Sequence, residues 1–178
     1  MIRNAKAHDP GNSLGITYIR SDANDLSQLA SGKFDVVFAN MSLMDIEDAS
    51  GAIREVGRVL KSGGRFVASI SHPCFDNGSK SGWEIEKVSF ETKVYRKIRG
   101  YRKPFADQIP WRLPNGDKRY TVAFHRPLSW YARELHSSGL AITALEEPEG
   151  DEEFREKESD AAGFLEVPLH VVIEALKL

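Results

Sequence analysis

The sequence predicts an α/β domain with a parallel sheet, and three consecutive segments carry most of that prediction. Residues 34–39 (FDVVFA) form an apolar run with the length of a buried strand. Residues 49–61 carry apolar side chains at helical spacing, with Asp48 placed to cap the first turn and two glycines placed to end the helix. Residues 65–70 are again apolar and β-prone. Strand, helix and strand with short connections make a βαβ unit, whose two strands are parallel.

The bulk properties of the chain limit the classes of function. Its 178 residues suffice for one domain with its own core. A net charge of −2 at pH 7 provides no general attraction to nucleic acid or membrane surfaces. The single cysteine, Cys74, excludes an internal disulfide and fits a reducing, cytoplasmic location. No apolar run has the length of a membrane span, and the N-terminus lacks the apolar core of a secretion signal.

Shorter patterns predict the elements around this unit. Predicted helical segments lie within residues 1–8, at 26–30 and at 129–138, the last capped by Ser129 and ended by Gly139. Predicted strands lie at residues 16–20, 120–124, 140–145 and 169–178. Residues 150–160 (GDEEFREKESD) are a run of charges typical of a solvated segment.

Residues 76–119 differ in composition from the rest of the chain. Eleven Lys or Arg side chains stand against six Asp or Glu, interleaved with six aromatic residues. Residues 85–98 alternate with a period of two, which predicts a hairpin or strand pair. We interpret 76–119 as an insertion, or lid, within a single domain spanning 1–178. The basic-aromatic mixture is also compatible with single-stranded nucleic acid, but the slightly acidic domain makes that alternative the weaker one.

Four segments together resemble the class I S-adenosylmethionine-dependent methyltransferases, in particular the type 11 branch that acts on small molecules. They are residues 21–26 (SDANDL), 34–48, 54–75 and 125–149. The resemblance implies a Rossmann-like sheet, mostly parallel with an antiparallel C-terminal strand, and helices on both faces. It implies transfer of a methyl group from S-adenosylmethionine to a small-molecule acceptor, with no metal site.

The resemblance also implies which residues contact the cofactor. Asp22 and Ala23 would bind the adenine, and Asn40 and Met41 would line the methionine and sulfonium region. Such a placement fits open α/β sheets, in which ligands bind beyond the carboxyl ends of the strands. The competing interpretation is that Asp22 only turns the chain and caps the next segment.

Candidate substrate and catalytic residues lie after the two strands of the βαβ unit and before the last predicted helix. His72 and Asp45 could orient the acceptor or take its proton, and His125 and Tyr131 would contact it. The alternatives are a structural histidine in a turn, an exposed acid and a packed tyrosine. Methyl transfer needs little acid–base chemistry, because positioning an already electrophilic methyl group supplies most of the rate.

The chain departs from the family at its start. The glycine-rich loop that follows the family's first strand, and the acidic residue that ends its second, have no counterpart in this sequence. We therefore expect a truncated methyltransferase sheet and weak or absent cofactor binding. The bare edge of strand 34–39 could be covered by strand 16–20, by a second copy or another chain, or by an upstream segment. An alternative function follows: a non-catalytic, methyltransferase-like protein that binds a partner through this edge.

Overall fold

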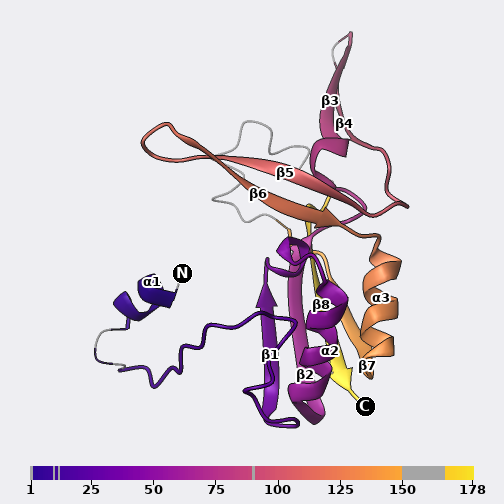
Figure 1. Ribbon diagram of the computed structural model, residues 1–178. Helices are drawn as coiled ribbons and strands as arrows, with labels where there is room; N and C mark the ends of the chain where they lie inside the picture. The colour runs from indigo at the N-terminus through magenta and orange to yellow at the C-terminus, as the bar shows by residue number, and fades with distance from the viewer. Residues whose placement is uncertain (1, 10, 12, 90, 150–166) are drawn as a thin grey trace.

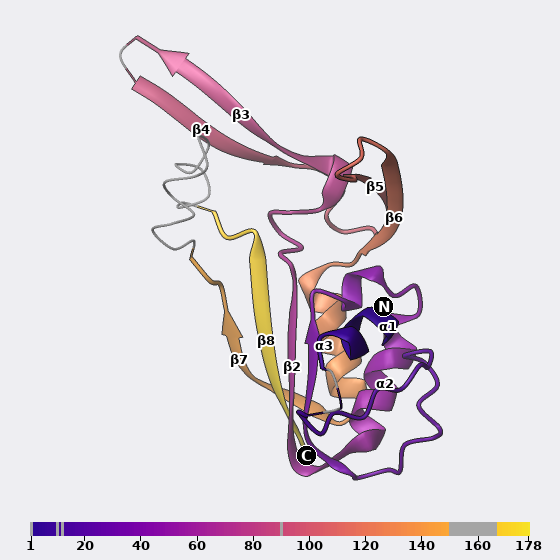
Figure 2. The same ribbon diagram turned by 90° about the vertical axis from the view of Figure 1, so that its left-hand side faces the viewer.

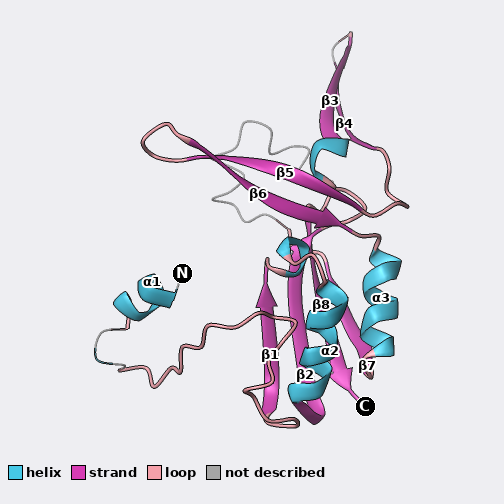
Figure 3. Ribbon diagram, in the orientation of Figure 1, coloured by secondary structure: helices cyan, strands magenta, loops and turns pink. Residues whose placement is uncertain are grey.

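A computed structural model describes every residue except 1, 10, 12, 90 and 150–166 (Figures 1 and 3). The charge run predicted at 150–160 lies outside the described residues.

The body of the molecule is a four-stranded sheet. Its order is β1 (Phe34–Asn40), β2 (Leu60–Ser71), β8 (His170–Lys177) and β7 (Leu140–Glu146). β1 and β2 are parallel, whereas β8 is antiparallel to both β2 and β7. Three strands therefore run in one direction and only the C-terminal strand is reversed, which confirms the predicted sheet.

Two helices, α2 (Ala49–Val59) and α3 (Leu128–Ser137), cover one face of this sheet (Figure 2). The core on that face contains Ile53 of α2, Leu135 of α3 and the fully buried strand residues Phe66 and Ile173. The resemblance implied helices on both faces; in the described residues, α2 and α3 share one. On the opposite face none of the described helices packs against β1, and its side chains Val36 and Phe38 remain exposed there.

The helix of the βαβ unit begins where the sequence predicts. Asp48 caps α2, its Oδ1 accepting a hydrogen bond from the backbone N–H of Gly51 at 2.9 Å. The helix ends at Val59, earlier than the predicted residue 61, because the chain enters β2 directly at Leu60. The glycines that were expected to end the helix instead lie within β2.

Two antiparallel hairpins form the region between β2 and α3. β3 (Ser81–Val88) pairs with β4 (Glu91–Ile98), and β5 (Phe105–Arg112) pairs with β6 (Lys118–His125). The first confirms the predicted hairpin. The strand predicted at 120–124 lies within β6, but its partner β5 was not predicted. The β5–β6 hairpin crosses above the ends of β1 and β2, and β3–β4 projects away from the sheet (Figure 1).

The N-terminal segment differs most from expectation. α1 (Ile2–Ala7) forms but buries none of its residues, and it lies apart from the sheet (Figure 1). Residues 16–20 are irregular rather than a strand, and 26–30 form turns rather than a helix. A strand is stable only when its backbone groups are paired, and nothing in the described chain pairs with 16–20. One of the three expectations was that residues 16–20 would cover the outer edge of β1. In the structure they do not pair with it.

Candidate functional site

A cavity of about 460 Å³ lies at the carboxyl ends of β1 and β2, beneath the β5–β6 hairpin. The loop after β1 contributes Met41, Met44 and Asp45 to its wall. The turn after β2 contributes a second set of residues, and the underside of the hairpin a third. Residues far apart in sequence thus meet at one site, at the edge of the sheet where open α/β folds bind ligands.

The end of β1 is held in an uncommon backbone conformation. Met41 has a φ of 44°, in the left-handed region that non-glycine residues seldom adopt. Its N–H donates to the carbonyl oxygen of Ser69 at 2.9 Å and to Oγ of the same serine at 3.0 Å. The Ser69 hydroxyl in turn donates to Oδ1 of Asn40 at 2.6 Å. Backbone strain of this kind clusters at ligand sites, and Ser69 maintains it here.

Asp45 follows in the short helical turn η2 (Leu43–Asp45) and lines the cavity. Desolvation by the surrounding walls raises the pKa of its carboxyl, although the side chain remains accessible. Within the described residues, no hydrogen bond or ion pair engages this carboxylate. Asp45 is therefore free to bind a ligand, as its predicted role requires.

A buried arginine supports this loop. Arg126 donates from Nη2 to the carbonyl oxygens of Ile46 and Glu47, both at 2.7 Å, and from Nη1 to that of Leu43 at 3.4 Å. Its guanidinium also lies 4.8 Å from the ring centroid of Trp130. The sequence gives no sign of this role, because the three carbonyl groups belong to a loop about eighty residues earlier in the chain.

His125 and Tyr131, the predicted substrate residues, both line the same cavity. The His125 ring stacks on Phe105 with centroids 4.9 Å apart, and its Nε2 lies 2.8 Å from the carbonyl oxygen of Tyr101. Burial lowers the pKa of His125, which favours the neutral imidazole near pH 7. Burial raises the pKa of Tyr131, so its phenol stays protonated.

His72, the other candidate acid–base residue, is placed differently. Its side chain is only 2% exposed and does not line the cavity. Its Nδ1 accepts from the N–H of Cys74 at 3.1 Å, and its Nε2 lies 2.7 Å from Oε1 of Glu147. With both ring nitrogens engaged, His72 is positioned to brace the turn after β2, the alternative that the sequence left open.

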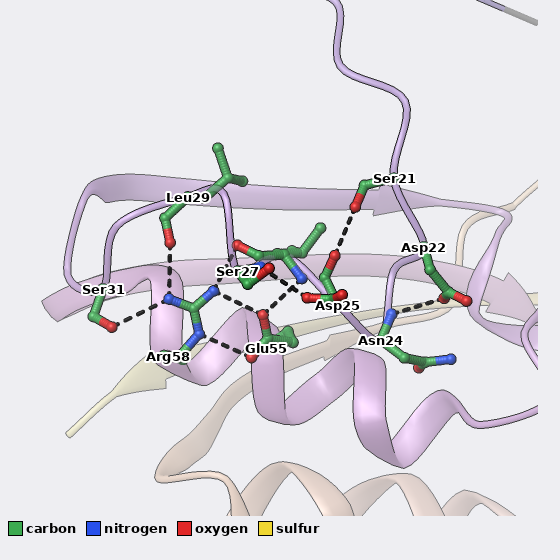
Figure 4. A network of polar contacts seen from close by, with 10 residues as sticks. Ser21, Asp22, Asn24, Asp25, Ser27, Leu29, Ser31, Glu55 and Arg58 are labelled. Atoms are coloured by element: carbon green, nitrogen blue, oxygen red, sulfur yellow. Dashed lines mark hydrogen bonds and ion pairs between the residues drawn. The ribbon is translucent and has the colours of Figure 1, made fainter.

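The predicted adenine contacts, Asp22 and Ala23, lie in a loop along α2 (Figure 4). Oδ1 of Asp22 accepts from the N–H of Asn24 at 3.0 Å, which is the turn-forming role. Neither residue lines the cavity, and neither does Asn40. Of the four predicted cofactor residues, only Met41 lies at the cavity wall; Asn40 is hydrogen-bonded to Ser69 of β2, and Asp22 and Ala23 lie in the loop along α2.

Comparisons with known proteins now bear on this arrangement. A family model described as a methyltransferase domain matches residues 1–68. The crystal structure of an S-adenosylmethionine-dependent methyltransferase from Mesorhizobium loti matches with 28% identity and a TM-score of 0.75, over 99% of this chain and 75% of that one. A proposed methyltransferase of the same kind from Listeria monocytogenes matches at 20% identity and a TM-score of 0.76, over 98% of this chain and 75% of that one.

By family model and by fold, the chain resembles the class I S-adenosylmethionine-dependent methyltransferases. The family model covers residues 1–68 of this chain, and the similarity of fold to the Mesorhizobium loti methyltransferase extends over nearly all of it. A glycopeptide N-methyltransferase solved in complex with S-adenosylmethionine shares the fold at 17% identity and a TM-score of 0.56, over 99% of this chain and 71% of that one. No protein with a curated description matches the sequence.

Several residues of this methyltransferase-like site were not predicted. Phe105, Asp107, Ile109 and Trp111 alternate along β5 and line the cavity together. Pro110 favours a turn when the sequence is considered alone, whereas in the structure it lies within β5 opposite Tyr120 of β6. Asn77, at the turn before the hairpins, was also missed.

Two further features of the described residues bear on cofactors and location. No group of three or more His, Cys, Asp or Glu side chains is arranged to hold a metal ion in the described part of the chain. None of the described helices has the length and apolar character needed to cross a bilayer.

Proposed function

We propose that this chain transfers the methyl group of S-adenosylmethionine to a small-molecule acceptor bound in the cavity under β5–β6. The observation that carries the proposal is that Met41 and Asp45 after β1, His125 at the end of β6 and Tyr131 of α3 meet at one cavity. The cavity volume of about 460 Å³ lies in the range of small-molecule sites. The proposal includes a cytoplasmic location, which rests on the single cysteine.

The chemistry expected of the chain's residues is mainly positioning. When bound, the cofactor would supply a methyl group attached to a positively charged sulfur atom. Its carbon–sulfur bond would break with both electrons going to sulfur, so that the rest of the cofactor is released as a neutral thioether. Asn40 and Met41, held by Ser69, fit its methionine end because they lie at the strained end of β1. Asp45 would hold the acceptor so that the lone pair of the acceptor atom points at the methyl carbon, in line with the carbon–sulfur bond. The acceptor's surplus proton would leave to water.

We propose that residues 76–119 act as a lid over this site. Support comes from β5, whose alternate side chains form the cavity's upper wall, and from its pairing with β6. The paired unit extends past the expected boundary to His125. A wall over the acceptor would exclude water during transfer.

The direct experiment is a methyl-transfer assay with the 178-residue chain, S-adenosylmethionine and a small-metabolite extract, reading the release of S-adenosylhomocysteine. Release is expected from the unmodified chain and from Arg133→Ala, an exposed control on α3, and should be lost in Met41→Asp. If the unmodified chain released no more S-adenosylhomocysteine than Met41→Asp, the proposal would be contradicted. A separate titration of S-adenosylmethionine is expected to show weak binding, because the family's glycine-rich loop and acidic ribose-binding residue have no counterpart in this sequence. A micromolar dissociation constant would show that expectation to be wrong.

A second candidate function is binding of a protein chain at the edge of β1. Val36 and Phe38 are 56% and 63% exposed, and the described residues leave the outer edge of β1 without a paired strand. A strand added at this edge would form hydrogen bonds with the unpaired N–H and C=O groups of β1 and cover the side chains of Val36 and Phe38. We propose a second copy of this chain as the simplest occupant.

A further inference from the structure

Two of the donors at the cavity, Arg126 and His125, are already engaged within the protein. Arg126 directs its guanidinium to the carbonyl oxygens of the loop after β1. His125 has its Nε2 on the carbonyl oxygen of Tyr101. Nearby, the ammonium of Lys80 lies 3.3 Å from the centroid of the Phe105 ring. A carboxylate or a phosphate that used Arg126, His125 or Lys80 would have to displace one of these contacts.

The acceptors, in contrast, are partly free. The carboxylate of Asp45 has no partner among the described residues. Asn77 lines the same cavity and is only 3% exposed, and its Oδ1 has no hydrogen-bond partner in the described chain. Its Nδ2 donates to the carbonyl oxygen of Arg99 at 2.9 Å, which fixes the amide orientation. A buried acceptor without a donor is costly, so the site favours a ligand or water that brings N–H or O–H groups.

Two further carboxylates stand on the cavity wall. Asp107 accepts from the N–H groups of Ser79 at 2.6 Å and Gln108 at 3.0 Å, and the first of these contacts does most to lower its pKa. Asp76 is paired with Arg96 at 3.1 Å. Asp107 therefore remains charged near neutral pH, and it lies on the strand that also presents apolar and aromatic side chains.

The walls around these groups are apolar and aromatic. Phe105, Ile109 and Trp111 project from β5, and Tyr131 projects from α3. Aromatic faces attract a positively charged or N–H-bearing group and bury the apolar body that carries it. The site thus combines a free carboxylate, an unpaired amide oxygen and aromatic walls.

We propose that the methyl acceptor is an amine carried on an apolar or aromatic body, with its nitrogen at Asp45 and its body against β5. The inference rests on the proposed function for the position of the site. In the transfer, the bound ammonium group first loses one proton to water, which frees the nitrogen lone pair. The lone pair then forms the bond to the methyl carbon, the carbon–sulfur bond breaks with its electrons on sulfur, and the methylated nitrogen keeps the positive charge. Asp45 accepts a hydrogen bond from the N–H and orients the lone pair.

Binding to the cofactor-free chain tests this proposal. Three probes of similar shape are titrated at pH 7 by calorimetry: 2-phenylethylamine, 3-phenylpropionate and 3-phenylpropan-1-ol. The amine is expected to bind about tenfold more tightly than the carboxylate. Asp45→Asn, which keeps the side-chain shape, should abolish most of this preference. Asp35→Asn, at the opposite end of β1 and 80% exposed in its side chain, is the matched control and should leave the preference unchanged.

The outcomes separate the two proposals. Equal binding of the three probes, a preference for the carboxylate, or a preference unaffected by Asp45→Asn would each overturn the amine assignment. Asp45-dependent amine binding without any release of S-adenosylhomocysteine would support the amine assignment and contradict the proposed methyl transfer. Methyl transfer to a hydroxyl or thiol acceptor, with no amine binding, would support the proposed methyl transfer and contradict the amine assignment.

Discussion

Arg58 and Glu55, one turn apart on α2, form a doubly hydrogen-bonded ion pair that faces the loop of residues 21–31 (Figure 4). Nε of Arg58 donates to Oε1 of Glu55 at 2.8 Å, and Nη2 donates to Oε2 at 2.7 Å. The same arginine donates to the carbonyl oxygens of Leu26 and Leu29, and Oε2 of Glu55 accepts the N–H of Leu26 at 2.9 Å. The pair therefore fastens to a helix the loop that carries the proposed adenine contacts.

Replacing Arg58 with methionine should release this loop, because the loop has no strand to hold it. The loss of several charge-assisted hydrogen bonds is expected to lower the free energy of unfolding by about 2–3 kcal/mol, measured by urea denaturation. Arg54→Met on the same helix is the control, since its side chain is 67% exposed and its contact to Asp48 is 4.0 Å long. Equal stability of the two variants would show that the loop does not depend on Arg58.

The same pair predicts a pH dependence. Hydrogen bonding to Arg58, more than any other cause, lowers the pKa of Glu55 from 4.5 to about 2. A lowered folded-state pKa stabilises the protein fully above the unfolded value and loses that contribution as pH falls through the folded value. The stability difference between the unmodified chain and Glu55→Gln should therefore be constant above pH 4.5 and shrink between 4.5 and about 2. A difference independent of pH across this window, measured by urea denaturation at each pH, would contradict the assignment.

Arg126→Met should lower the free energy of unfolding by about 3 kcal/mol. The reason is that the carbonyl groups of Leu43, Ile46 and Glu47, in the loop at the cavity wall, lose a buried hydrogen-bond donor. Arg126→Lys should recover only part of the loss, since one ammonium cannot reproduce the planar fork of the guanidinium. Thermal unfolding provides the measurement, with Arg133→Met, exposed on α3, as the control. An Arg126→Met variant as stable as this control would rule out the supporting role.

The open edge of β1 predicts self-association. Sedimentation velocity of the unmodified chain should show concentration-dependent dimers, and an apolar dye should bind it. Phe38→Lys places a charge on the exposed face beside this edge and should shift the population to monomer. Ile85→Lys, on the β3–β4 hairpin and 55% exposed, should not. A strictly monomeric chain without dye binding would count against an edge-mediated partner.

Much of the sheet could be predicted because its signals are local. The apolar run of β1, the helical spacing of α2 and the cap at Asp48 all lie within a few residues of each other, and each was found in the predicted place. The strands β7 and β8 and the helix α3 were also predicted from local apolar patterns. The predicted cap at Ser129 was wrong, because α3 begins at Leu128 and its N-cap, Pro127, has no side chain that accepts a hydrogen bond. Within the site, Asp45, Met41, His125 and Tyr131 were named in advance, and the structure brings them to one cavity.

Where the prediction was wrong, pairing between distant segments decided the outcome. Residues 16–20 have the composition of a strand, but a strand needs a neighbour, and the described chain offers them none. β5 has a proline that argues against a strand, yet it forms one because β6 pairs with it. Arg126 has a structural role only because the chain returns to a loop eighty residues earlier.

The order of the strands and helices, and with it the methyltransferase resemblance, was readable from the amino-acid sequence, because side-chain periodicity and capping act over short distances. The membership of the cavity was not readable in this way. It depends on a hairpin that folds across the sheet, on an arginine that reaches back to the loop after β1, and on an ion pair that holds loop 21–31 to α2. Each of these contacts joins segments whose proximity arises only when the whole core packs.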